Sequence, residues 1–386
     1  MDTGGKKKIT VAICYDFDKT LSPDDMQSQG FIQSLGFTEV QEFWKESNNL
    51  AENNDMDHIL AYMYMMAIKS RGKNVFNKQI LMDAGKKIAF FPGVEEWFDR
   101  INNYGRVRGI EVQHFIISSG LKEMIEGTSI GKEFHEIYAS SFYYDEYGVE
   151  VWPAQVVNYT NKTQFLFRIE KGALGVNDSK INDFVKPEDY VVPFRNMVYI
   201  GDSDTDIPCM KLVNTKGGYS IGVYDPDKND RSKVFKMLND NRIKYFVPAD
   251  YREGSALDKL VKEIIDRTEN NEKLVGFHNE CLHEMQTAEI GKSNDDKAKE
   301  NLINKLEDSD SFRSTHRIIQ GLASYKDWTD SQRNKLIHIA LTTHQVTYIL
   351  GDPDVKEFFE NICNGLGKNK GEEAEKLLSM MRNCSA

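Results

Sequence analysis

The chain has 386 residues, of which 40% are hydrophobic and 28% are charged, and its formal net charge is −11. This length is too great for one small core and predicts two or three domains. The acidic balance argues against nucleic-acid binding as a main activity. The five cysteines are scattered without a paired framework, which is typical of a reducing cytoplasm, so we expect a cytoplasmic protein.

The first strand is predicted over residues 10–16. Its apolar run is too short and too rich in Val and Ile for a helix, and it is typical of a buried parallel strand. Because this run follows the lysines at 6–8 and meets Asp16 at once, it is predicted as a strand rather than a signal peptide. Asp16 and Asp18 stand at its carboxyl end, where open α/β sheets bind ligands. Unpaired carboxylates are costly to bury, so these two indicate a metal, a nucleophile or both.

Residues 21–90 carry helical patterns and no convincing strand, which predicts a helical cap inserted after the first strand. The apolar run at 59–68 is too short to span a bilayer, and we expect no membrane association. The chain re-enters the core near Pro92 and Gly93, which are hinge candidates.

Two groups in this insertion have open interpretations. Asp24, Asp25 and Gln27 either meet a substrate amine or hydroxyl or cap the first helix of the insertion. The methionines and tyrosines that follow either line a pocket or fill the core of the cap, which is the commoner use of Met. This second group consists of Tyr62, Met63, Tyr64, Met65 and Met66.

Further strands are predicted over residues 112–117, 136–140, 197–200, 219–223 and 245–248, with a hairpin over 142–152 that turns at Gly148. The strand at 112–117 is expected to end in an open turn at Ser118 and Ser119, which suits phosphate. Lys162 precedes a helix pattern at 163–169, and Lys171 at the far end of that pattern is the alternative lysine.

A second acidic cluster follows the strand at 197–200. Gly201 makes a turn there, Asp202 comes directly after it, and Asp206 follows four residues later. Hard oxygen ligands without His or Cys nearby favour Mg²⁺ over Zn²⁺. Carboxylates, a hydroxyl, a lysine and a metal are the groups that phosphoryl transfer requires.

In this order and spacing, four segments resemble the motifs of the haloacid dehalogenase superfamily of phosphohydrolases. These segments are Asp16-x-Asp18-x-Thr20, Ser118, Lys162 and Gly201-Asp202-x-x-x-Asp206. The resemblance covers about residues 8–250 and is greatest to phosphoserine-phosphatase-type members, which carry a helical cap between the first two motifs. It implies an α/β fold with a Rossmann-like parallel sheet. The stretch 176–195, between the third and fourth motifs, departs from the pattern as an insertion.

The resemblance implies catalytic roles. Asp16 would be the nucleophile that forms an aspartyl-phosphate, and Asp18 would act first as general acid and then as general base. Ser118 and Lys162 would bind the phosphoryl oxygens. The backbone N–H groups of Phe17, Asp18 and Ser119 would complete the phosphate-binding site.

It also implies a Mg²⁺ site. The carboxylates of Asp16 and Asp202 and the backbone carbonyl of Asp18 would hold the ion. Asp206 would support this metal shell or orient Lys162.

Two related loops fit less well. The segment Asp18-Lys19-Thr20 resembles the phosphorylated loop of ion-pumping ATPases, but Leu21 and Ser22 do not continue that loop. Dehalogenases lack the second acid that Asp18 supplies.

We therefore expect a Mg²⁺-dependent phosphomonoesterase acting on a small phosphorylated metabolite. The alternatives are a phosphotransferase or mutase on the same fold, or a regulatory protein that works through its C-terminal helices.

The predicted organisation is a catalytic core over 8–20 and 91–254, the cap over 21–90 and a C-terminal helical region over 255–386. We expect this last region to bind a protein partner or to self-associate, because no catalytic motif occurs in it. Its helices are predicted to start near Ser255, Thr329 and Asp352, with an exposed helix or linker at 291–312 and a frayed tail from Lys368. It also contains three potential metal ligands that complete no four-ligand set, His278, Cys281 and His283.

Overall fold

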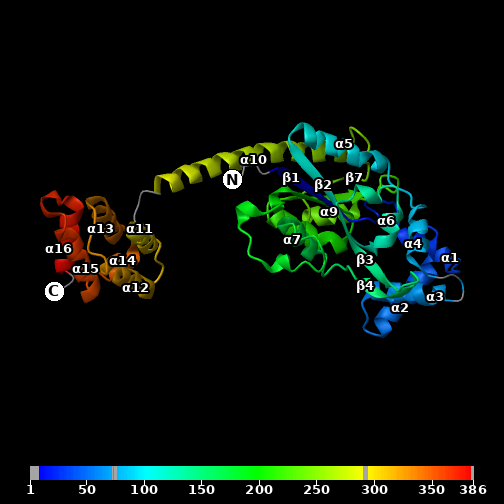
Figure 1. Ribbon diagram of the computed structural model, residues 1–386, viewed down its shortest axis with the longest axis horizontal. Coiled ribbons are helices and arrows are strands. Elements are labelled where there is room, and N and C mark those ends of the chain that lie inside the picture. Colours follow the sequence, from blue (N-terminus) through cyan, green and yellow to red (C-terminus); the bar gives the residue numbers. More distant parts are fainter. Residues whose placement is uncertain (1–7, 72, 74–75, 290–293, 384–386) are drawn as a thin grey trace. The chain divides into compact units, whose positions relative to one another are not determined.

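The computed structural model describes residues 8–71, 73, 76–289 and 294–383 (Figure 1). The chain divides into two compact units, Met1–Phe277 and His278–Ala386. Within the described part of the chain, every helix is too short or too polar to cross a membrane.

The first unit is built on a seven-stranded sheet of order β4-β3-β2-β1-β5-β6-β7. Only the β3–β4 pair is antiparallel, and all other neighbours are parallel. The strands are β1 (Ile9–Tyr15), β2 (Ile110–Leu121), β3 (Glu136–Tyr144), β4 (Glu150–Gln155), β5 (Met197–Gly201), β6 (Tyr219–Tyr224) and β7 (Tyr245–Pro248). The predicted α/β fold with a parallel sheet and a hairpin is confirmed.

Both faces of the sheet are buried, as the continuous apolar run of β1 predicts. Val11, Ile13 and Tyr15 point into one core cluster, while Ala12 and Cys14 point into the other. Helices α5 (Val94–Val107) and α10 (Ala256–Glu289) cover the first face. The second face is covered by α7 (Thr163–Lys171), α8 (Ile207–Thr215) and α9 (Ser232–Asn239).

Among the described residues between β1 and α5 there are four helices, in the place where the sequence predicts a helical insertion (Figure 1). They are α1 (Phe31–Ser34), α2 (Val40–Asn53), α3 (His58–Ser70) and α4 (Lys78–Gly85). The chain leaves the insertion at Gly93, whose φ of 81° favours glycine. A Cβ at Gly93 would lie 2.5 Å from the backbone nitrogen of Arg252, so this exit point is tightly packed.

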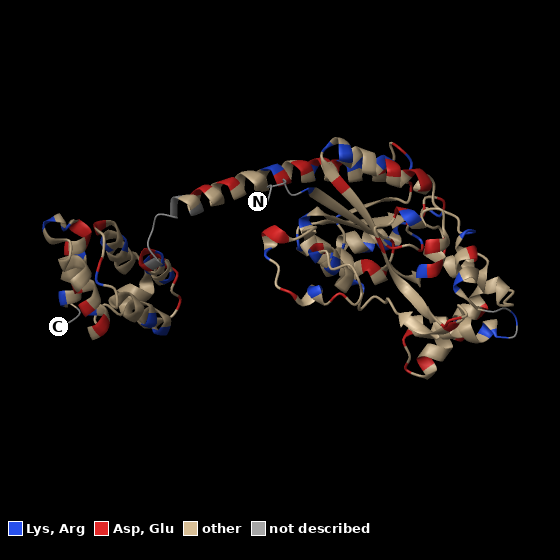
Figure 2. Ribbon diagram, in the orientation of Figure 1, with Lys and Arg blue, Asp and Glu red and all other residues tan. Residues whose placement is uncertain are grey.

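Helix α10 belongs to the first unit for much of its length, which differs from the predicted division at residue 255. Ser255 caps its start, since its Oγ accepts from the Asp258 backbone N–H. Leu257 and Val261 are fully buried against the sheet. Both signs of charge lie along the helix (Figure 2), and the Asp258 carboxylate accepts from the Nε of Arg100 on α5 at 3.1 Å. These contacts explain why the compact unit extends to Phe277.

The second unit is a bundle of helices around its own apolar core. Its helices are α11 (Asn294–Glu307), α12 (Phe312–Ala323), α13 (Asp330–Thr342), α14 (His344–Tyr348), α15 (Pro353–Asn364) and α16 (Glu372–Asn383). The predicted starts at Thr329 and Asp352 are confirmed, and Thr329 forms a capping box with Gln332.

Two expectations for this unit are wrong. The stretch 291–312 contains α11, which buries Ile303 and Leu306 rather than lying fully exposed. The tail after Lys368 is not frayed over its described residues, because Leu377 and Met381 of α16 are buried in the core. In both helices the named apolar residues are three or four positions apart, so the helical spacing brings them to one face.

Candidate active site

The carboxyl ends of three adjacent strands bring the motif residues to one edge of the sheet. Tyr15 pairs with Ile116 on β2 and with Ile200 on β5. The Asp16 backbone N–H donates to the Ile200 carbonyl at 2.9 Å, which continues the ladder beyond the strand. Because Ser118 and Asp202 each lie two residues beyond those pairing positions, the strand register brings them to the same edge as Asp16.

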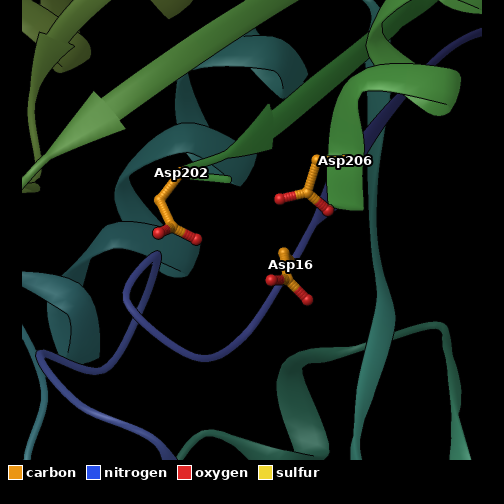
Figure 3. A group of neighbouring side chains, drawn as sticks. All are labelled: Asp16, Asp202 and Asp206. Carbon is orange, nitrogen blue, oxygen red and sulfur yellow. The ribbon is translucent and has the colours of Figure 1, made fainter. Parts of the chain in front are cut away.

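Three carboxylates converge at this edge. Asp16, Asp202 and Asp206 each offer an oxygen, and these oxygens lie within 4.8 Å of one another (Figure 3). Asp16 and Asp206 are buried, and Asp202 is partly exposed. Across the described residues, no other three His, Cys, Asp or Glu side chains gather in this way, and His278, Cys281 and His283 do not.

Lys162 joins two of these carboxylates. Its Nζ donates to Asp16 Oδ1 at 3.1 Å and to Asp206 Oδ1 at 2.8 Å, and its side chain is 1% exposed. Burial alone would lower the pKa of Lys162, but the facing carboxylates of Asp16 and Asp206 outweigh burial and raise it. The ammonium therefore stays charged. Lys171 lies elsewhere, since its Nζ donates to the carbonyl oxygens of Ile181 and Asp183.

The carboxylate of Asp206 is fully engaged by donors. Its Oδ1 accepts from the Tyr199 hydroxyl at 2.9 Å as well as from Lys162, and its Oδ2 accepts from the Ser203 hydroxyl at 3.3 Å. Gly201 makes room for it, because a Cβ there would lie 2.6 Å from Asp206 Oδ2. Asp206 therefore contacts Lys162 directly.

The crowding of acids changes their protonation. Burial and the facing Asp206 raise the pKa of Asp16 to about 6, against the lowering effect of Lys162. Burial, Asp206 and Asp16 raise the pKa of Asp202 to about 8. A divalent cation among these carboxylates would offset their repulsion. The donor set contains only oxygen atoms, so these residues fit Mg²⁺.

The loop after Asp16 folds tightly on itself. The Phe17 carbonyl accepts the N–H groups of Thr20, Leu21 and Ser22. The Asp18 carboxylate accepts from the backbone N–H of Met26 at 2.8 Å, which fixes its direction. Burial and the neighbouring carboxylates of Asp25 and Asp16 raise the pKa of Asp18 well above its usual range.

The predicted end of the second strand at residue 117 is wrong. β2 continues to Leu121, and its pairing with β3 shifts register between Ile117 and Leu121. Ser118 therefore lies in an irregular strand segment rather than in an open turn, and its Oγ accepts from the Gly120 N–H at 3.1 Å. The strand continues because β3 also runs on and pairs Ser140 with Leu121.

Of the two roles that the sequence leaves open for the residues after the first motif, the structure does not show helix capping by Asp25. Asp25 precedes the 3₁₀ turn at Met26–Ser28 but makes no side-chain capping bond, and it forms an ion pair with Lys19 at 2.8 Å instead. Asp24 accepts from the Asp25 N–H, and Gln27 is buried.

Several contacts around the site have no signal in the motifs. The Tyr62 hydroxyl on α3 donates to the Ser119 carbonyl at 2.7 Å, and Asn158 Nδ2 donates to Asp57 Oδ2 at 2.8 Å. The N-cap at Asp57 is readable from its position before the apolar run of α3. Its second contact, with Asn158, is not readable because it joins residues that are 101 positions apart.

The chain is similar to known proteins in sequence and in fold. A scan against models of known protein families finds no match. An uncharacterized protein of Borreliella burgdorferi is 27% identical over 293 residues, and the alignment covers 67% of this chain and 98% of that protein. About a third of this chain therefore has no counterpart in that relative.

Among solved structures, the fold has distant neighbours. A HAD-family hydrolase from Salmonella enterica is 16% identical, with a TM-score of 0.40 and coverage of 61% of this chain and 66% of the other. A phosphoserine phosphatase in its apo form is 16% identical, with a TM-score of 0.42 and coverage of 66% and 98%. A probable phosphoserine phosphatase from Vibrio cholerae is 14% identical, with a TM-score of 0.43 and coverage of 69% and 67%.

Proposed function

We propose that this protein is a Mg²⁺-dependent phosphomonoesterase of the haloacid dehalogenase superfamily, acting on a small phosphorylated metabolite. The observation that carries the proposal is the buried bridge from Lys162 to Asp16 and Asp206, with Asp202 beside it. A nucleophile, a fixed positive charge and an all-oxygen donor set at one strand edge suit phosphoryl transfer. The resemblance of the four motifs supports the same reaction.

In the first step, an Asp16 carboxylate oxygen attacks phosphorus, and the bond between phosphorus and the ester oxygen breaks. Asp18 gives its proton to the departing oxygen, so an alcohol leaves. The product on the protein is an aspartyl-phosphate at Asp16. The hydrogen bond from the Met26 N–H to Asp18 holds the acid beside this loop.

In the second step, the Asp18 carboxylate takes a proton from water, and the water oxygen attacks phosphorus. The bond between phosphorus and the Asp16 oxygen breaks, which releases inorganic phosphate and restores both carboxyl groups. Lys162 and Ser118 would hold phosphoryl oxygens through both steps, together with the backbone N–H groups of Phe17, Asp18 and Ser119.

Asp16, Asp202 and the Asp18 carbonyl would hold Mg²⁺, with Asp206 behind them orienting Lys162. When bound, the ion neutralises charge on the phosphoryl oxygens and lowers the cost of bringing an anion to Asp16. The same proposal includes a cytoplasmic location, a covering role for the insertion at 21–90 and a partner-binding or self-association role for the C-terminal helices.

The test is a screen of phosphorylated metabolites for phosphate release, with Mg²⁺ and with a chelator. We expect release from at least one small monoester that depends on Mg²⁺ and disappears in Asp16→Asn. Asp204→Asn is the matched control, because Asp204 is an exposed acid beside the same site. Release without any added acceptor would separate hydrolysis from phosphotransfer. Absence of release from every monoester, or undiminished release in Asp16→Asn, would contradict the proposal.

A further inference from the structure

One helix of the insertion contacts both segments that carry the phosphate-binding candidates. Helix α3 reaches the segment before Lys162 through Asp57 and the segment after Ser118 through Tyr62. The two contacts come from different turns of α3 and reach different parts of the core. The two hydrogen bonds therefore fix the position of α3 relative to both core segments.

The contact through Asp57 reaches the turn that presents Lys162. Asp57 Oδ1 caps α3 by accepting the N–H groups of Ile59 and Leu60, while its Oδ2 accepts from Asn158 Nδ2. Asn158 organises the turn, because its carbonyl accepts the N–H groups of Asn161 and Lys162. One carboxylate thus ties the helix start to the residue that fixes the Lys162 backbone.

The contact through Tyr62 reaches the strand segment after Ser118. The Tyr62 hydroxyl donates to the Ser119 carbonyl, and the tyrosine is 4% exposed. Its ring meets Trp44 edge to face at a centroid distance of 5.8 Å. A side chain held in this way limits the movement of the Ser119 backbone, whose N–H is a proposed phosphate donor.

Helix α3 is itself firmly packed. Met63 and Met66 are fully buried in the core cluster that also contains the first face of the sheet. Tyr64 lies on the other side of the helix and is 51% exposed. The helix therefore has a fixed inner face from which its two polar contacts extend.

We propose that α3 is a brace that sets the positions of Lys162 and of the Ser118–Ser119 segment, with Asp57 and Tyr62 as positioning residues. Neither residue touches the reacting atoms in this proposal; each acts through a hydrogen bond to the core. Its kinetic consequence rests on the proposed phosphatase function, whereas its structural consequence does not. Small misplacements of positioned groups lower rates strongly, because phosphoryl transfer depends on alignment.

The first experiment changes the Asp57 contact without removing the helix cap. Asp57→Asn keeps an oxygen for the cap but turns an amide toward the Asn158 amide, so two donors face each other. We expect kcat/KM for p-nitrophenyl phosphate to fall about tenfold or more. The double variant Asp57→Asn with Asn158→Asp reverses donor and acceptor and should recover most of that loss.

The second experiment removes one hydroxyl from α3. Tyr62→Phe keeps the ring and should lower kcat/KM and weaken inhibition by inorganic phosphate by a similar factor, about three- to tenfold. Tyr64→Phe is the matched control on the exposed face and should change neither quantity. A purely structural role would instead lower the melting temperature and leave the kinetics of the folded protein unchanged.

Amide hydrogen exchange separates this proposal from the phosphatase assignment. In Asp57→Asn, exchange should rise at residues 158–166, and in Tyr62→Phe at residues 117–123, whether or not the wild type hydrolyses phosphate esters. Faster local exchange with an inactive wild type would support the brace and contradict the phosphatase. If the wild type is active, either of two results would contradict the brace. One is that both single variants keep wild-type kinetics and wild-type hydrogen exchange. The other is that the double variant with the swapped pair fails to recover activity.

Discussion

Lys162 and Asp206 form an ion pair at 2.8 Å in which the two side chains are 1% and 0% exposed. The pair joins the start of α7 to the turn that leads into α8. A buried ion pair adds little net stability, because desolvation offsets the attraction, but removing one partner leaves an expensive buried charge. The pair therefore holds the lysine in place more than it stabilises the fold.

Asp206→Asn should lower the free energy of unfolding by about 2–3 kcal/mol. This is somewhat less than the cost when a buried charge loses its only partner, because Asp16 still faces Lys162. The exposed Asp204, in the same 3₁₀ turn, provides the control Asp204→Asn, which should change stability by less than about 0.5 kcal/mol. Urea unfolding of both variants measures the difference. Equal unfolding free energies would show that the Asp206 charge does not support Lys162.

Asp16→Asn should lower turnover by at least about a thousandfold, because an amide is not a nucleophile toward phosphorus. The fold should persist, since the change removes one of three facing carboxylates. Steady-state kinetics on the best monoester, together with a far-ultraviolet circular dichroism spectrum, check both statements. Activity near the wild-type level in a clean preparation would remove Asp16 from the role of nucleophile.

Asp18→Asn should trap the phosphorylated protein. A substrate with a good leaving group still phosphorylates Asp16, but the base that activates water is missing. We expect an acid-stable, hydroxylamine-labile label on the protein. Rapid turnover without accumulated label would show that another group activates water.

The acidic motif residues Asp16 and Asp202 were predictable from sequence because each stands where a buried run ends. The apolar runs before Asp16 and Asp202 predict strands, and the carboxyl ends of parallel strands meet at one edge. Their convergence in the structure follows from that register rather than from the motif alone.

The contacts of the insertion were not predictable in the same way. Tyr62 meets Ser119 across 57 positions, and its sequence context indicates only a buried aromatic residue. Such a contact depends on how the inserted helices pack on the core, which no local pattern specifies. The extension of β2 through Leu121 has a similar cause, because its partner strand β3 also continues.

His316 should make the second unit less stable as pH rises. Its ring nitrogens contact the Asp354 carboxylate at 2.9 Å and the Asp352 carboxylate at 3.0 Å, and these contacts raise its pKa. A raised pKa in the folded state adds stability below the unfolded value near 6.5, and this stability is lost as pH rises through the folded pKa.

We therefore expect hydrogen exchange in α12 and α15 to rise, beyond the intrinsic effect of pH, as the pH rises above about 6.5. His316→Ala should remove this pH dependence, and high salt should reduce it because the site is partly exposed. If His316→Ala showed the same pH dependence of hydrogen exchange, another titrating group would be its cause.

A chain that ends at Phe277 should fold and keep kcat/KM within about twofold, because the compact first unit ends there and contains every motif residue. A chain that ends at Thr268 should be less stable, because it loses Glu272. The Glu272 carboxylate accepts hydrogen bonds from Arg195 at 2.9 Å and from Asn196 at 3.1 Å. These two residues lie directly before β5, the strand whose end leads to Asp202.

Loss of these two contacts should cost about 1–3 kcal/mol, and Glu272→Gln in the full chain should reproduce part of it. Thermal unfolding, kcat/KM and the solution mass of the three proteins test the expectation. A folded, soluble chain ending at Phe277 without activity would show that residues 278–386 take part in the chemistry. Equal stability of the two truncated chains would show that α10 beyond Thr268 does not support the segment before β5.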